Sequence, residues 1–178
     1  MCIAPQARRT VRRPWQKLFA AALVSLLAVV GVARAATHSG QPNPRPRIGN
    51  SITIESYDEH VRITVLAVQT PAKLAYRFAT PAAGDRYVGV LLRIVNLSQQ
   101  RYNDSPSNGA RLITATRAAY AITLPGKEPN LDEMAAIPPG GQHTGWLTFE
   151  VPAQARLAEF LFVLDSGFAA ARGLWLLH

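Results

Sequence analysis

From Asn50 to its end, the chain consists of short runs rich in β-branched and aromatic residues, separated by clusters of Pro, Gly, Asn and Asp. This pattern is typical of β-strands joined by tight turns. The runs expected to form strands are SITIES at 51–56, HVRITVLAV at 60–68, RYVGVLLRIVN at 86–96, ARLITAT at 110–116, AAYAITL at 118–124, GWLTFEV at 145–151, EFLFVL at 159–164 and GLWLL at 173–177. They predict an all-β fold, an immunoglobulin-like β-sandwich, with a small closed barrel as the competing architecture.

The alternation of apolar and polar residues within these runs predicts which side chains face the core, because successive side chains of a strand point to opposite faces. In the run at 60–68, the inward set is Val61, Ile63, Val65 and Ala67. The run at 159–164 is apolar on both faces. Because an outer sandwich face is normally polar, its outer residues Leu161 and Val163 are either covered by a linker or available to a partner. They are the candidate partner-binding residues.

The first 35 residues have the three regions of a secretion signal. A basic stretch, ARRTVRRPWQK, leads into an apolar run of 15 residues and then into Ala33-Arg34-Ala35, a small-x-small pattern that signal peptidase accepts. We expect a cleavable signal peptide at 1–35, exported by the Sec route or by the twin-arginine route that RRPWQK resembles. The alternative is an uncleaved membrane anchor, although a spanning helix needs roughly 20 apolar residues.

The formal net charge of +8 is concentrated in this leader. Residues 1–35 hold six of the 19 Lys and Arg and no acid, which leaves 13 bases against 11 acids in the rest of the chain. Nucleic-acid binding requires a concentrated basic face, so we exclude it. The single cysteine, Cys2, also lies in the leader. The mature chain therefore has no disulfide, no thiol chemistry and no lipid-attachment cysteine.

Residues 36–49, ATHSGQPNPRPRIG, contain three prolines and two glycines and predict a flexible linker before a sandwich domain at 50–178. Cleavage after Ala35 starts the mature chain with Ala36-Thr37-His38. A free amino group, two amide nitrogens and the His38 imidazole make the square-planar set that Cu²⁺ and Ni²⁺ prefer. A metal-binding protein outside the cytoplasm, using His38 with His60 or His143 as further ligands, is therefore the alternative function.

Catalytic motifs are weak in this sequence. Asp165-Ser166-Gly167 follows an apolar run, as the Asp-Ser/Thr-Gly of aspartic proteases does, but that chemistry needs two carboxylates. Only 13 residues follow Asp165, too few to complete such a fold, so we interpret the motif as a turn. The polar loop at 101–112 offers oxygen atoms to Ca²⁺, yet Asp104 is its one carboxylate, so we interpret it as a connection.

Four motifs occur in order along the chain: AGDRYVGVLLRIVNLS, YNDSPSNGARLITA, IPPGGQHTGWLTFEVP and FLFVLDSGF. In order and spacing they resemble a family of exported bacterial domains of unknown function, the DUF4352 type, similar in architecture to the mycobacterial immunoprotective extracellular antigen. The resemblance covers residues 50–178 and implies an immunoglobulin-like sandwich outside the cytoplasm. It implies no catalytic residue, and this chain lacks the lipid-modified cysteine of many members.

These observations together predict a secreted or cell-envelope binding module with no catalytic activity and no cofactor. We expect it to be a monomer or a weak oligomer. Its partner is an unknown protein or an envelope component, and it contacts the membrane only through the leader if that is not cleaved.

The Ala36-Thr37-His38 motif generates the first testable prediction. Protein secreted by its natural host and cut after Ala35 should bind Cu²⁺ with one-to-one stoichiometry, and His38→Ala should abolish that binding because the imidazole closes the square-planar set. A copper titration followed by visible absorption measures both. Amino-terminal sequencing that finds Thr37 as the first residue would remove the basis for the site.

Overall fold

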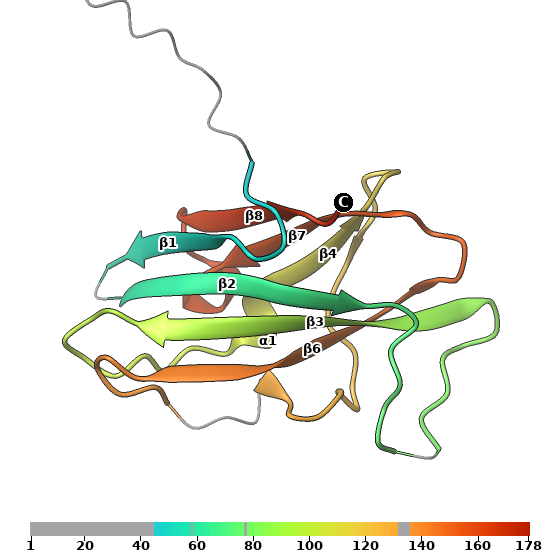
Figure 1. Ribbon diagram of the computed structural model, residues 1–178, viewed down its shortest axis with the longest axis horizontal. Helices are drawn as coiled ribbons and strands as arrows, with labels where there is room; N and C mark the ends of the chain where they lie inside the picture. The colour runs from blue at the N-terminus through green and yellow to red at the C-terminus, as the bar shows by residue number, and fades with distance from the viewer. Residues whose placement is uncertain (1–44, 58, 77, 132–135) are drawn as a thin grey trace, which may run out of the picture. The chain divides into compact units, whose positions relative to one another are not determined.

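The computed structural model describes residues 45–57, 59–76, 78–131 and 136–178. Within them the chain forms two four-stranded antiparallel sheets, in the strand orders β1-β2-β3-β6 and β5-β4-β7-β8. Figure 1 shows β1, β2, β3 and β6 as one layer, with β4, β7 and β8 in the layer behind it. The two separate sheets confirm the predicted sandwich and exclude the closed barrel.

The strands lie close to the runs expected from the sequence. Their bounds are β1 Ser51–Ser56, β2 Glu59–Gln69, β3 Asp85–Asn96, β4 Ala110–Thr114, β5 Ala119–Tyr120, β6 Gln142–Pro152, β7 Leu157–Val163 and β8 Arg172–Leu176. In the described part of the chain, the short helical turn α1 Pro106–Gly109 lies between β3 and β4, and the turn η2 Asp165–Gly167 lies between β7 and β8. The hairpin predicted around Arg117 is present, although β5 is only two residues long.

The core fills the space between the two sheets and is held by aromatic contacts across them. Phe149 of β6 meets Phe160 of β7 edge to face, with ring centroids 6.2 Å apart. Phe160 also lies 5.9 Å from the indole of Trp175 on β8. All three side chains are fully buried. The indole N–H of Trp175 donates to the carbonyl of Asn50 at 3.0 Å, so the one polar group of these three side chains is satisfied.

A β-bulge in β2 corrects one predicted inward residue. Val61, Ile63 and Val65 are fully buried, as the alternation predicts, but the register between β2 and β3 shifts between Val65 and Ala67. Val68 then pairs with the core residue Val90 and packs against the core, whereas Ala67 pairs with Leu91 on the other face. The extra residue of a bulge reverses the facing of the residues after it. The prediction that Ala67 points inward was therefore wrong.

Irregular segments cover two of the sheet edges. Pro46 accepts a hydrogen bond from the amide of Leu176, and Arg47 bridges β8 in parallel, so the end of the predicted linker lies along β8. On the other sheet, Ile122 and Asn130 bridge β6 at Phe149 and Trp146. Covered edges protect a sandwich from pairing with other chains.

The bulge yields a prediction that separates two neighbouring residues. Val68→Ser should lower the free energy of unfolding by about 1 kcal/mol, because it removes a valine packed on the core. Ala67→Ser should change it by less than about 0.5 kcal/mol, as surface substitutions do. Urea unfolding of both variants measures the difference. A larger loss for Ala67→Ser would contradict the bulged register.

Candidate functional site

The Asp165-Ser166-Gly167 motif forms the turn η2 after β7. Asp165 has φ 54° and Ser166 has φ 50°, backbone conformations that strands do not adopt. The amide and hydroxyl of Ser166 donate to Oδ1 of Asp104 at 2.7 and 2.8 Å. The motif therefore ties the end of β7 to the polar loop before α1, which confirms the interpretation as a turn.

Asp104 is the anchor of that polar loop. Its Oδ1 also accepts from the amide of Ser105 at 2.7 Å, and its Oδ2 accepts from the hydroxyl of Tyr102 at 3.4 Å. Protein donors thus engage both oxygens of the one carboxylate that the loop could offer to Ca²⁺. This supports the interpretation of the loop as a connection.

Three carboxylates gather at this end of the sandwich. Glu59 begins β2, and its Oε2 is buried with no hydrogen-bond partner among the residues that the structure describes. Burial raises the pKa of Glu59, and the nearby charges of Asp104 and Asp165 raise it further, while a hydrogen bond from the Asp165 backbone lowers it. Burial, with acidic neighbours, also raises the pKa of Tyr102 far above its usual value. Tyr102 is therefore a neutral donor at physiological pH.

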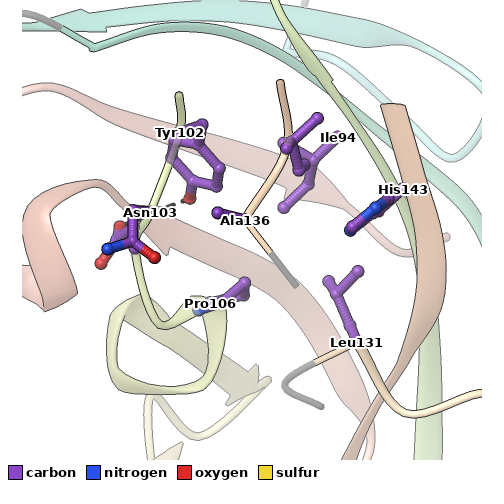
Figure 2. A pocket seen from close by; sticks show the side chains of 9 residues that line it. Ile94, Tyr102, Asn103, Pro106, Leu131, Ala136 and His143 are labelled. Atoms are coloured by element: carbon purple, nitrogen blue, oxygen red, sulfur yellow. Dashed lines mark hydrogen bonds between the residues drawn. The ribbon is translucent and has the colours of Figure 1, made fainter. Parts of the chain in front are cut away.

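A small cavity lies beside this acidic end. Figure 2 shows Tyr102, Asn103 and Pro106 on one side of it and Leu131 and His143 on the other. Its volume is about 30 Å³. That is the space of about one water molecule and far below the several hundred Å³ of a typical ligand site. As described, the cavity is therefore much smaller than a typical ligand site.

The two described histidines of the predicted metal set lie in different surroundings. His60 contacts Glu55 through Nε2 at 3.1 Å, across the β1–β2 pair, while His143 lines the small cavity. Within the described ranges no group of three or more His, Cys, Asp or Glu residues could hold a metal ion. His38 and the Ala36-Thr37-His38 motif lie outside the described residues, so the Cu/Ni site stays a prediction.

Leu161 and Val163 lie on the outer face of β7, as predicted, because Phe160 and Phe162 occupy the inner face and are fully buried. Both outer residues are only half-buried. Leu161 lies between Arg111 of β4 and Leu174 of β8. On the same face, the buried Glu159 pairs with two arginines, Arg45 at 2.7 Å and Arg117 at 3.3 Å. The face is thus a small apolar strip beside an ion-pair cluster.

A second apolar surface lies on the loops, where the sequence did not lead us to expect one. The loop between β2 and β3 extends away from the sheets in Figure 1 and carries Tyr76 and Phe78, which are 55% and 91% exposed. These two residues and Pro125 line an open pocket of about 520 Å³. Leu124, next to Pro125, is 70% exposed. We call Tyr76, Phe78, Leu124 and Pro125 the loop patch.

The signal for the loop patch was present in the sequence. A connection between strands is normally polar, yet TPAKLAYRFATPAAG at 70–84 contains two aromatic residues and a leucine. Alternation assigns a face to an apolar residue only within a strand. Alternation gives no criterion for an aromatic residue in a loop, so it could not predict that Tyr76 and Phe78 are exposed.

The sequence of the chain matches a known protein family. Residues 52–171, from β1 to the residue before β8, match a family described as a domain of unknown function, DUF4352. The chain belongs to the DUF4352 family. This confirms the resemblance found in the four sequence motifs. No curated protein sequence matches the chain.

Solved structures of other proteins, among them two bacterial ones, have a similar sandwich fold. A secreted protein from Mycobacterium tuberculosis, MPT63, has a TM-score of 0.56 at 14% identity, over 74% of this chain and 95% of that protein. The yjhA protein from Bacillus subtilis has a TM-score of 0.52 at 13% identity, over 75% of this chain and 99% of that one. At these identities the likeness shows the fold alone. The match to MPT63 agrees with the mycobacterial architecture that the sequence motifs implied.

The described part of this DUF4352 chain contains no helix that is long and apolar enough to cross a membrane. The leader lies outside the described residues, so its predicted cleavage and export route stay predictions.

The acidic end generates a prediction about stability and pH. A carboxyl group whose pKa is raised by folding binds its proton more tightly in the folded state. Its ionised form therefore destabilises the folded protein. This destabilisation is absent at low pH, where the group is protonated in both states, and it develops as pH rises through the folded pKa. Glu59→Gln should therefore increase the free energy of unfolding at pH 7.5, and the gain should disappear below the ordinary glutamate pKa of about 4.3.

Urea unfolding at pH 7.5 and pH 3.5 measures this difference, with Glu55→Gln as the control, because Glu55 is exposed and its surface pair with His60 contributes little to stability. For each pH, the free energy of unfolding of Glu59→Gln is compared with that of the unchanged protein. If the variant is less stable than the unchanged protein at pH 7.5 but not at pH 3.5, burial is not the cause of the raised pKa of Glu59.

Proposed function

We propose that this chain is an extracytoplasmic binding module without catalytic activity, and that it binds a protein partner through the loop patch. The observation that carries the proposal is the gathering of Tyr76, Phe78 and Pro125 at a solvent-exposed pocket, next to the exposed Leu124. Exposed aromatic side chains that gather on one surface are typical of protein interfaces, because desolvating them supplies much of the binding free energy.

The location rests on the sequence of the leader. A basic stretch, an apolar run and the Ala33-Arg34-Ala35 site favour export, and the chain after them is nearly neutral. A binding role rather than catalysis is supported by the acidic end, where Asp104 is engaged by protein donors and the adjacent cavity has room for about one water.

The charges beside the loop patch indicate what its partner presents. Nζ of Lys127 lies 3.5 Å from the carbonyl of Lys73, which brings two basic residues to the two loops that carry the patch. Glu128, the acid next to Lys127, accepts the amide of Asn130 with its Oε2 and keeps its negative charge, so the two lysines leave a net charge of about +1 beside the patch. A partner with an apolar centre and an acidic rim therefore complements this surface.

The outer face of β7 is the second candidate surface, as expected from the sequence. Leu161 and Val163 offer less apolar area than the loop patch, because both are half-buried between neighbouring strands. Ion pairs of Glu159 with Arg45 and Arg117 border this face. We rank it below the loop patch for that reason.

Site-specific photo-crosslinking tests the proposal. A benzophenone amino acid is placed at Phe78, at Leu161 or at Tyr57, and the protein is irradiated in the extracytoplasmic fraction of the cells that naturally produce it. Tyr57 is 95% exposed on the turn between β1 and β2, so it is a matched control outside the loop patch. We expect one discrete protein adduct from position 78, and none from position 57.

Affinity for the captured partner then gives the magnitude. Phe78→Ser should weaken binding at least about tenfold, as truncating an interface anchor does, while Tyr57→Asn should leave it unchanged. Equal crosslinking at positions 57 and 78 would overturn the proposal. Adducts from position 161 alone would move the interface to the outer face of β7.

A further inference from the structure

A third surface feature, independent of the loop patch, is a pocket at the end of the sandwich between the two sheets. It is a shallow hollow open to solvent, with a volume of about 550 Å³. Its lining is half polar and half apolar, and the larger apolar side chains come from four segments of the chain: Ile48 before β1, Val68 of β2, Leu157 of β7 and Leu177 after β8. Val68, Leu157 and Leu177 also pack against the core. The floor of this end pocket is therefore continuous with the core.

Two arginines line the same end pocket, Arg86 and Arg156, and no Asp or Glu is among its lining residues. Arg86 belongs to the inner face of β3, because it is two residues before the fully buried Val88 and side chains alternate along a strand. A cation on the inner face of a sandwich is unfavourable unless its charge is compensated.

Arg86 is only partly satisfied by the protein. Its Nη1 donates to the carbonyl of Ala153, and its Nη2 donates to the carbonyl of Ala155 at 2.6 Å, so it holds the turn between β6 and β7. Its Nε is buried and has no hydrogen-bond partner among the described residues, so an anion entering from solvent would meet the Nη groups. No described carboxylate forms an ion pair with it within 4.0 Å. Carbonyl oxygens satisfy two of five donors but do not neutralise the charge.

We infer that the end pocket binds an anionic amphiphile, a molecule with a carboxylate or phosphate head and an apolar chain. The head would lie between Arg86 and Arg156, where charge-assisted hydrogen bonds to guanidinium groups are strongest. The chain would cover Ile48, Leu157 and Leu177. The proposal uses both features, because no described carboxylate pairs with Arg86 and the apolar side chains of the pocket are at least partly exposed to solvent.

Isothermal titration calorimetry of the full mature chain tests this inference with four probes, of which the three amphiphiles are used below their critical micelle concentrations. Decanoate and decyl phosphate carry both features, decyl maltoside keeps the chain with a neutral head, and acetate keeps the head without the chain. We expect one-to-one binding of decanoate or decyl phosphate, and binding at least about tenfold weaker for the other two probes. The tighter of the first two identifies a fatty acid or a phosphate ester as the source.

Variants assign the binding to this pocket. Arg156→Gln changes an exposed side chain and should weaken decanoate binding several-fold, whereas Arg93→Gln, an exposed arginine on the outer face of β3, should not. Arg86→Lys keeps the charge but loses the planar fork, and it should weaken binding at least about tenfold. If Arg86→Lys does not fold, Arg156→Gln and Leu177→Ser test the site in its place. Each should weaken decanoate binding, because the first removes a cation from the pocket and the second removes an apolar side chain from it.

The inference is overturned if decanoate and decyl maltoside bind equally, if neither anionic probe binds, or if Arg156→Gln and Leu177→Ser both bind decanoate as tightly as the unchanged protein.

Discussion

The contact of Phe149 with Phe160, and of Phe160 with Trp175, is the interaction on which the two-sheet arrangement depends. Phe149 belongs to one sheet, and Phe160 and Trp175 belong to the other. The three rings therefore hold the inner faces of the two sheets together. Since the chain has no cysteine after Cys2, no disulfide could replace them. Burying three large aromatic side chains supplies several kcal/mol of stability, of the order of the whole net stability of a small domain.

Because the inner faces are committed to this core, the surfaces available for binding are the loops and the ends of the sandwich. Three features of the molecule reflect that division. The acidic end around Asp104 fastens loops to one another, the loop patch exposes aromatic side chains, and the end pocket opens where the core meets solvent. A sandwich uses its strands for stability and its connections for recognition.

Alternation along the sequence was enough to predict the strands, the inward Phe160 and Phe162 and the outward Leu161, because period two is a local property. It failed at Ala67, since a bulge leaves no mark in the hydrophobic pattern when the residues from 65 to 68 are all apolar. The acidic end could not be predicted either. Its carboxylates come from segments far apart in the sequence, and only the pairing of strands brings Glu59, Asp104 and Asp165 to one end.

Arg86 shows why a strand end is the hardest place to interpret from sequence alone. In DRYVGV, an arginine two residues before Val88 is what a strand entering solvent would carry, so the alternation treats it as unremarkable. Its position becomes informative only when β6 and β7 place their connecting turn over it and bury its Nε. Arg86 is thus a half-buried cation on the inner side of β3 with no described carboxylate to pair with, and this is the observation behind the proposed anion site.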